Sequence, residues 1–174
     1  PSSRIGGDPF LPSGTISPFK TVEAAVSSIA NGEAVWVLLK RGDVFYAGLP
    51  TRSGKSADQP FLYSSYGNGS EPPLFKTGAE SGVSHCCEAL EHFWVVGLSF
   101  YAHTRDPESS DYIGDAGDRG IYLETIRGRK LNNILIEGNV LRYYKDNVIQ
   151  SFNGSGIGPN ITLRRNMILD GYNS

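Results

Sequence analysis

A nine-residue segment near the end of the chain occurs twice, and this repeat constrains the fold more than any other feature. Asn-Ile-Leu-Ile-Glu-Gly-Asn-Val-Leu at 133–141 returns as Asn-Ile-Thr-Leu-Arg-Arg-Asn-Met-Ile at 160–168, an offset of 27 residues. Apolar residues recur at alternate positions, which is typical of strands that bury one face. Several short strands within a period of this length predict a solenoid.

The repeat extends upstream of these two copies. Residues 118–124 align with 146–152 at an offset of 28, which places Asp118 and Asp146 at equivalent positions. A weaker copy at 93–100 precedes the segment 102–118, which has five acidic residues and almost no apolar ones. We interpret this acidic segment as a loop inserted between strands.

Stacking of coils assigns roles to the repeated residues. Apolar side chains at matching positions of successive coils should meet inside the solenoid. Asn139 and Asn166 fall between two inward positions, where the chain must turn sharply. We expect a left-handed backbone at each Asn and a hydrogen bond between the two amides.

The rest of the chain predicts one helix and a series of short strands. After an irregular lead-in at 1–18, Thr21 is suited to the N-cap and Asn31-Gly32 to the end of a helix over 21–31. The 21 Gly and 10 Pro fit a turn-rich, all-β chain. We expect a single domain of 174 residues, with coils over 34–169 and strands at 35–39, 61–64, 74–77, 93–101, 121–124, 134–141, 148–152 and 161–169.

Composition excludes some classes of protein. A net charge of −2 does not fit a protein that binds nucleic acid through a basic surface. The longest fully apolar run, 34–39, is too short to cross a membrane.

Cys86 and Cys87 are adjacent and can form a vicinal disulfide, but free Cys is often buried, so we favour two small side chains in the core.

Four segments of the chain carry a resemblance to a known family. Residues 18–45 combine the expected helix with a strand, 59–75 contain a strand and a Tyr-Gly-x-Gly turn, and 132–141 and 160–169 follow the pattern Asn-x-x-Ile-x-x-Asn-x-Ile. These parts resemble right-handed parallel β-helix proteins of the pectate-lyase-like superfamily, and the likeness covers nearly the whole chain from about residue 14. It implies an all-β fold, a right-handed parallel β-helix with a short N-terminal capping helix and an asparagine ladder. It also favours a secreted or periplasmic protein.

The end of the chain departs from the family pattern. Family members continue for many more coils and finish in a cap, whereas the last coil here ends near Leu169 with no C-terminal cap evident. An open coil exposes apolar core and unpaired strand edges. We therefore expect this end to be covered in a homo-oligomer or by further coils, and we expect the chain to be inactive alone.

The resemblance implies that a polysaccharide, acidic or neutral, binds in a groove along one outer face. Carboxylates one coil apart should lie about 5 Å from each other. Asp118 and Asp146 could therefore share a Ca²⁺ or act as an acid and base. The side chains expected to contact the sugar are Arg119, Tyr144, His103 and Arg105.

Three functions fit these residues. In a polysaccharide lyase, Lys145 or Arg142 would remove the proton next to a uronate carboxylate. The calcium ligands would then be Asp118, Asp146 and Asp115. In a glycoside hydrolase, Asp118 and Asp146 would be the catalytic pair. In a non-catalytic protein of the tail-spike or adhesin kind, the same face would only bind sugar or another domain. An Asp before a strand is more commonly a plain turn residue, and this is the favoured interpretation of both Asp118 and Asp146. No nucleic-acid or membrane partner is expected.

Overall fold

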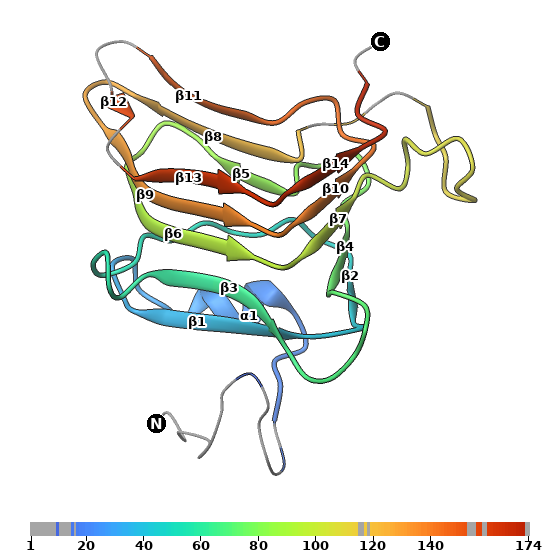
Figure 1. Ribbon diagram of the computed structural model, residues 1–174, viewed down its shortest axis with the longest axis horizontal. Coiled ribbons are helices and arrows are strands. Elements are labelled where there is room, and N and C mark those ends of the chain that lie inside the picture. The colour runs from blue at the N-terminus through green and yellow to red at the C-terminus, as the bar shows by residue number, and fades with distance from the viewer. Residues whose placement is uncertain are drawn as a thin grey trace.

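The chain is an ascending stack of coils above one short helix (Figure 1). The computed structural model describes residues 10, 15, 17–114, 117, 119–152, 156–157 and 160–172. The elements α1 (Val22–Ser27) and β1 (Val35–Lys40) lie at the lower end of the stack in this view, and the described C-terminal coil lies at the upper end. No helix within these ranges is long and apolar enough to span a membrane.

The helix α1 (Val22–Ser27) is capped as the sequence predicts but is shorter. The Thr21 hydroxyl accepts a hydrogen bond of 3.1 Å from the Ala24 N–H. Val22 and Val26 are buried and belong to the hydrophobic core. The helix already ends at the C-cap Ser28, so Asn31-Gly32 lies beyond it.

The described strands form three sheets, and neighbouring strands within each sheet run parallel. The predicted parallel β-solenoid is therefore confirmed. Successive strands along the chain alternate between these sheets. The first sheet contains β1 (Val35–Lys40), β3 (Phe61–Tyr66), β6 (Leu90–Val96) and β9 (Lys130–Glu137), with β12 (Gly156–Ile157) and β13 (Ile161–Arg164) both paired to β9. The second contains β2 (Val44–Phe45), β4 (Leu74–Lys76), β7 (Ser99–Tyr101), β10 (Val140–Arg142) and β14 (Met167–Leu169). The third contains β5 (Val83–His85), β8 (Ile121–Ile126) and β11 (Val148–Phe152).

Inward side chains of successive coils stack on one another to form the core. The Phe75 and Phe100 rings stack with centroids 5.3 Å apart, and Phe61 and Phe93 stack at 6.4 Å. All four rings are fully buried. The stacked rings bury a large apolar area in each coil, and this burial stabilises the fold.

The offset of 27 is confirmed, but the offset of 28 is wrong. Ile161 pairs with Ile134 in the first sheet, as the repeat predicts. In the third sheet, however, Val148 pairs with Tyr122, an offset of 26. In keeping with this register, the Asp146 carbonyl accepts a hydrogen bond of 3.0 Å from the Gly120 N–H. A shift of two residues keeps every side chain on its own face, so the apolar pattern cannot distinguish the two registers.

The asparagine ladder is present. The Asn139 amide donates to Asn166 Oδ1 at 3.1 Å and to the Val95 carbonyl at 3.0 Å. Its own Oδ1 accepts from the Leu98 N–H at 3.0 Å. Asn139 is fully buried, so these bonds satisfy main-chain groups that water cannot reach.

The left-handed residue of this turn is not the Asn. Positive φ occurs one position earlier in each coil, at Gly97 (71°), Gly138 (65°) and Arg165 (57°). A left-handed residue reverses the chain just before the ladder position, which aims the Asn side chain into the stack. The expectation of a left-handed Asn139 and Asn166 is therefore wrong.

Cys86 and Cys87 are joined to each other in a vicinal disulfide. The interpretation of two free cysteines in the core is thus wrong, and Cys86 is exposed. Both residues follow β5, where the chain leaves the third sheet, so Cys86 lies outside the packed interior.

Candidate functional site

The second sheet presents a row of polar side chains on its outer face. Lys76, Tyr101 and Arg142 are register partners on β4, β7 and β10. Their neighbours in sequence, Phe75 and Phe100, are buried, so the row points away from the core. The Arg142 guanidinium lies 5.1 Å from the centre of the Tyr101 ring.

The inserted segment folds back over this row. In its described part, 102–114, there is no strand, in agreement with the predicted loop. The Tyr101 hydroxyl donates to Asp106 Oδ2, and Asp111 Oδ2 lies 3.8 Å from Lys76 Nζ and 3.9 Å from His103 Nε2. The loop thus supplies two carboxylates to a face on which the strands supply cations.

Burial and this hydrogen bond change the acidity of the Tyr101–Asp106 pair. Burial, followed by the hydrogen bond to Asp106, raises the pKa of Tyr101 to about 12. The same hydrogen bond lowers the pKa of Asp106. Tyr101 therefore stays a neutral donor and Asp106 a charged acceptor near neutral pH. Their hydrogen bond attaches the start of the loop to β7.

His103 is held in one orientation beside Lys76. Its Nδ1 accepts a hydrogen bond of 3.2 Å from the Gly78 N–H, so the neutral ring carries its proton on Nε2. That nitrogen faces Asp111. His103 is buried, with 8% of the residue exposed.

Tyr46 stands at the rim of this cluster, directly after β2. It is 73% exposed, and its ring meets the His103 ring edge-on at 6.2 Å. Lys76 Nζ lies 5.8 Å from the centre of the Tyr46 ring. We refer to Tyr46, Lys76, His103 and Asp111 as the Tyr46 face.

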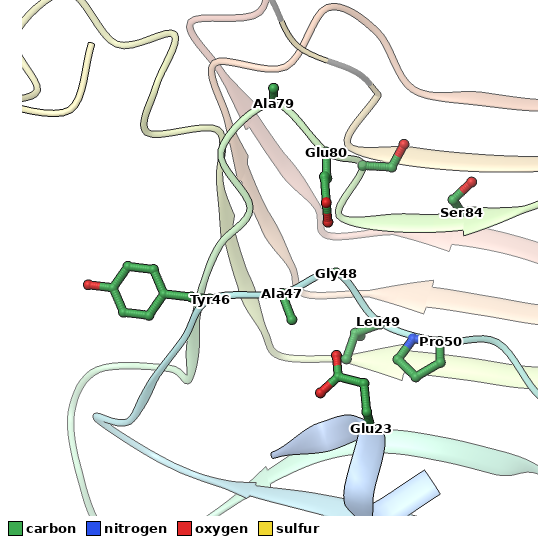
Figure 2. Close-up of a pocket in the computed structure, with 10 residues that line it drawn as sticks. Glu23, Tyr46, Ala47, Gly48, Leu49, Pro50, Ala79, Glu80 and Ser84 are labelled. Carbon is green, nitrogen blue, oxygen red and sulfur yellow. The ribbon is translucent and has the colours of Figure 1, made fainter. Parts of the chain in front are cut away.

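An open depression of about 590 Å³ adjoins the Tyr46 face. Its floor is the segment 46–50, its upper wall is 79–81 with Ser84, and its lower wall is Glu23 on α1. Figure 2 shows Glu80 above the floor segment and Glu23 below it, with the Tyr46 ring at the edge. Two carboxylates thus flank a hollow that ends in an exposed aromatic ring.

The residues predicted for the site divide into separate groups. His103 in the loop and Arg142 on β10 both contact the Tyr101 ring, with ring-centre distances of 6.0 and 5.1 Å, and lie at the second sheet. Arg119 and Asp146 form an ion pair of 3.0 Å next to the third sheet instead, and Lys145 is half-buried beside Asp146. The predicted ligands Asp115 and Asp118 lie outside the described residues.

Two predicted sugar-binding residues are buried in the fold. Arg105 is fully buried, donates to the Tyr172 carbonyl at 2.8 Å and lies 4.4 Å from the Tyr172 ring. Tyr144 is 2% exposed, and its hydroxyl pairs with Thr77 Oγ1 at 2.7 Å. Burial raises the pKa of Tyr144. In this structure Arg105 joins the loop to the end of the last coil, and Tyr144 joins the turn after β10 to the turn after β4.

One group of described side chains has the composition of a metal site. The ligand atoms of Cys86, Cys87 and Glu124 lie within 4.8 Å of one another. Asp146, the described member of the predicted calcium set, belongs to no such group among the residues that the structure describes.

The repeat and the apolar alternation do not point to Tyr46, Lys76, Glu23 or Glu80. Tyr46 follows a strand of only two residues, β2, which the alternation of apolar residues does not reveal. Lys76 approaches Tyr46 because β2 pairs with β4 in parallel. The available signal in the sequence is a Tyr next to the turn-forming segment Ala-Gly-Leu-Pro, between two expected strands.

Comparison with models of protein families, with curated proteins and with solved structures finds no match to this chain. The fold and the geometry described above therefore carry the functional argument.

Proposed function

We propose that this chain is a pectate-lyase-like β-solenoid that binds a polysaccharide on the Tyr46 face and in the adjoining depression. The observation that carries the proposal is the exposed Tyr46 ring, flanked by the oriented polar groups of Lys76, His103 and Asp111. A sugar ring has an apolar face that stacks on an aromatic side chain and a rim of hydroxyls that needs hydrogen bonds. The Tyr46 face offers both within one surface.

The geometry of the cluster supports recognition of hydroxyl groups. Lys76 Nζ and His103 Nε2 are donors, and Asp111 is an acceptor that lies within 4 Å of both. The loop that carries Asp111 is anchored through the Tyr101–Asp106 hydrogen bond, so little order must be imposed upon binding. The open depression leaves room for a chain longer than one sugar.

Affinity electrophoresis in gels with neutral and acidic polysaccharides tests this proposal. At least one polysaccharide is expected to retard the protein, and Tyr46→Ala is expected to weaken the retardation about ten-fold, because stacking and apolar contact are lost. Tyr112→Ala is the matched control: it removes a 44% exposed tyrosine from the same loop as Asp111. Retardation by no polysaccharide, or equal loss in both variants, would contradict the proposal.

Hydrolysis is the second candidate function, favoured by the two carboxylates that flank the depression. A pair of carboxylates can act as acid and base on a glycosidic bond. If Glu23 and Glu80 do so, reducing ends should appear and should be lost in Glu23→Gln and Glu80→Gln. Glu71→Gln, which changes an exposed carboxylate outside the depression, should keep full activity.

A calcium-dependent lyase based on Lys145 or Arg142 gives a different product. Elimination would yield unsaturated sugars that absorb in the ultraviolet, and chelation of calcium would abolish them. If the protein binds a polysaccharide but releases neither product from it, the protein binds sugar without catalysis. The Tyr46 face supports this form of the proposal directly.

A further inference from the structure

The turn after β5 brings two sulfur atoms and a carboxylate together on the third sheet. Cys86 Sγ lies 3.4 Å from Glu124 Oε1, and the Cys87 N–H donates to the Glu124 carbonyl at 3.2 Å. None of these residues belongs to the Tyr46 face. The group therefore needs an explanation that is independent of sugar binding.

The carboxylate of this group is held in place from the strand side. The Tyr122 hydroxyl donates to Glu124 Oε2 at 2.6 Å, so the other oxygen, Oε1, faces Cys86. The Arg119 guanidinium lies 4.3 Å from the Tyr122 ring and pairs with Asp146 at 3.0 Å. A ligand fixed by an outer partner in this way is typical of metal sites.

The cysteine turn is held from its other side. Arg129 Nη1 donates to the Cys87 carbonyl at 2.6 Å and forms an ion pair with Glu88 at 2.8 Å. Arg129 lies on the connection between β8 and β9, so a contact with the next coil anchors the turn. The backbone around the two sulfur atoms has supports other than the S–S bond.

We propose that reduction turns Cys86, Cys87 and Glu124 into a binding site for a thiophilic divalent cation of the zinc and cadmium class. A dithiol reductant supplies two electrons and two protons: the S–S bond breaks, two thiols form, and the reductant becomes a disulfide. Cation binding then releases the two thiol protons and leaves two thiolates. In the oxidised form the sulfur atoms carry neither charge nor proton, so the site exists only after reduction.

The spacing suits tetrahedral coordination. Zinc binds thiolate sulfur at about 2.3 Å and carboxylate oxygen at about 2.1 Å, so two such ligands on a tetrahedron lie about 3.6 Å apart. The observed distance from Cys86 Sγ to Glu124 Oε1 is 3.4 Å. Two thiolates and one carboxylate leave the fourth position to water, and soft sulfur ligands favour zinc or cadmium over calcium or magnesium.

A titration of the reduced chain with cadmium ions tests the proposal. After treatment with dithiothreitol and removal of the reductant, two thiols should be counted, and one equivalent of Cd²⁺ should produce thiolate-to-metal absorption in the ultraviolet. Glu124→Gln should lower the affinity at least ten-fold, and Tyr122→Phe, which removes the hydrogen bond to Oε2, about ten-fold. Asp43→Asn removes a distant carboxylate between β1 and β2 and should change nothing.

Several other results would contradict the proposed cation site. Equal affinity in Glu124→Gln would remove Glu124 from the ligand set, and binding by the double variant Cys86→Ser/Cys87→Ser would place the cation elsewhere. Circular dichroism of the reduced wild type and of Cys86→Ala/Cys87→Ala shows whether the fold outlasts the loss of the disulfide. A reduced chain that unfolds, or that stays folded without binding Cd²⁺, would overturn the proposal.

Discussion

Asn139 shows how much of this fold depends on a single polar side chain. Its side chain accepts a hydrogen bond from the Leu98 N–H and donates to the Val95 carbonyl and to Asn166 Oδ1. The residue is fully buried. Asn166 occupies the same position one coil later but is half-buried. The two residues therefore offer the same chemistry at two levels of burial.

Asn139→Ala is expected to lower the free energy of unfolding by about 2–4 kcal/mol, because two buried main-chain groups lose their partners. Asn166→Ala should cost clearly less, since water can reach the groups that it leaves. Urea denaturation followed by circular dichroism measures both. Equal losses of unfolding free energy in the two variants would show that burial does not determine how much each ladder Asn contributes to stability.

Tyr101 gives the molecule a dependence on alkaline pH. Its pKa is raised to about 12 in the folded chain from an ordinary value of 10, so folding favours the neutral phenol. This contribution to stability is complete below pH 10 and is lost as the pH rises from 10 toward 12. Asp106→Asn removes the acceptor and its charge and should bring the Tyr101 pKa closer to 10.

Melting temperatures between pH 9 and pH 12 check this prediction. The wild type should lose stability as the phenol ionises in the unfolded chain, and Tyr101→Phe should lose less over the same interval. Tyr144, whose pKa burial also raises, remains in both proteins, so the difference between them reports Tyr101. Identical slopes would contradict the prediction.

At the scale of single residues, the sequence predicted the Asn139–Asn166 hydrogen bond but misplaced the left-handed residue. A left-handed conformation is open to Asn and to Gly alike, so composition does not decide which of Gly138 and Asn139 adopts it. The disulfide between Cys86 and Cys87 was recognised as an alternative but not favoured, for a related reason. Whether adjacent cysteines lie inside or outside depends on where the coil turns, and β5 was not recognised as a strand.

Among the elements, the corner between the second and third sheets is built from stacked glycines. A Cβ on Gly48 would lie 2.5 Å from the Ser81 carbonyl oxygen, and one on Gly82 would lie 2.6 Å from the Gly120 carbonyl oxygen. One on Gly120 would lie 2.5 Å from the Asn147 side chain. Successive coils approach so closely here that only glycine fits.

Gly82→Ala is therefore expected to destabilise the chain by about 1–3 kcal/mol, because its neighbour is backbone and cannot turn away. The added methyl of Gly120→Ala meets only side chains, those of Asn147, Leu141 and Tyr144, which can shift where backbone cannot. Asn147 would then give up its hydrogen bond of 2.8 Å to the Ile121 N–H. We expect the smaller cost at Gly120. Thermal unfolding of both variants checks the order, and a neutral Gly82→Ala would refute close coil contact at this corner.

The long strands of the first sheet could be predicted from the sequence, whereas the short strands that build the candidate site could not. β9 and β13 have repeated alternation, but β2 has two residues and β5 has three. Tyr46 and Lys76 meet only because β2 and β4 pair across the coil. His103 was found because the composition of its loop stands out, and not because its partners were known.

For the whole molecule, each coil is stabilised by the coils on either side of it. In a solenoid the free energy of folding is approximately a sum of terms for single coils and for their interfaces. β9 is paired with β6 below and β13 above, while the inward side chain of Leu163 on β13 is 58% exposed. Stability should therefore decrease from the middle of the stack to its top.

Ile134 and Ile161 provide a matched test of this gradient, since they are register partners on β9 and β13. Ile134 is 1% exposed and Ile161 is half-buried. For this 174-residue chain, Ile134→Ala should cost about 2–5 kcal/mol of unfolding free energy, the usual loss for a buried Ile, and Ile161→Ala should cost at most about half as much.

Hydrogen exchange on the unmodified chain should give the same order. Backbone amides of β13 and β14 should exchange before those of β6 and β9, because local opening of the upper coil leaves the interfaces below it intact. If β9 and β13 exchange together and the two Ile variants cost the same, the coils form one cooperative unit. In that case stability would be set by the stack as a whole and not by the neighbours of each coil.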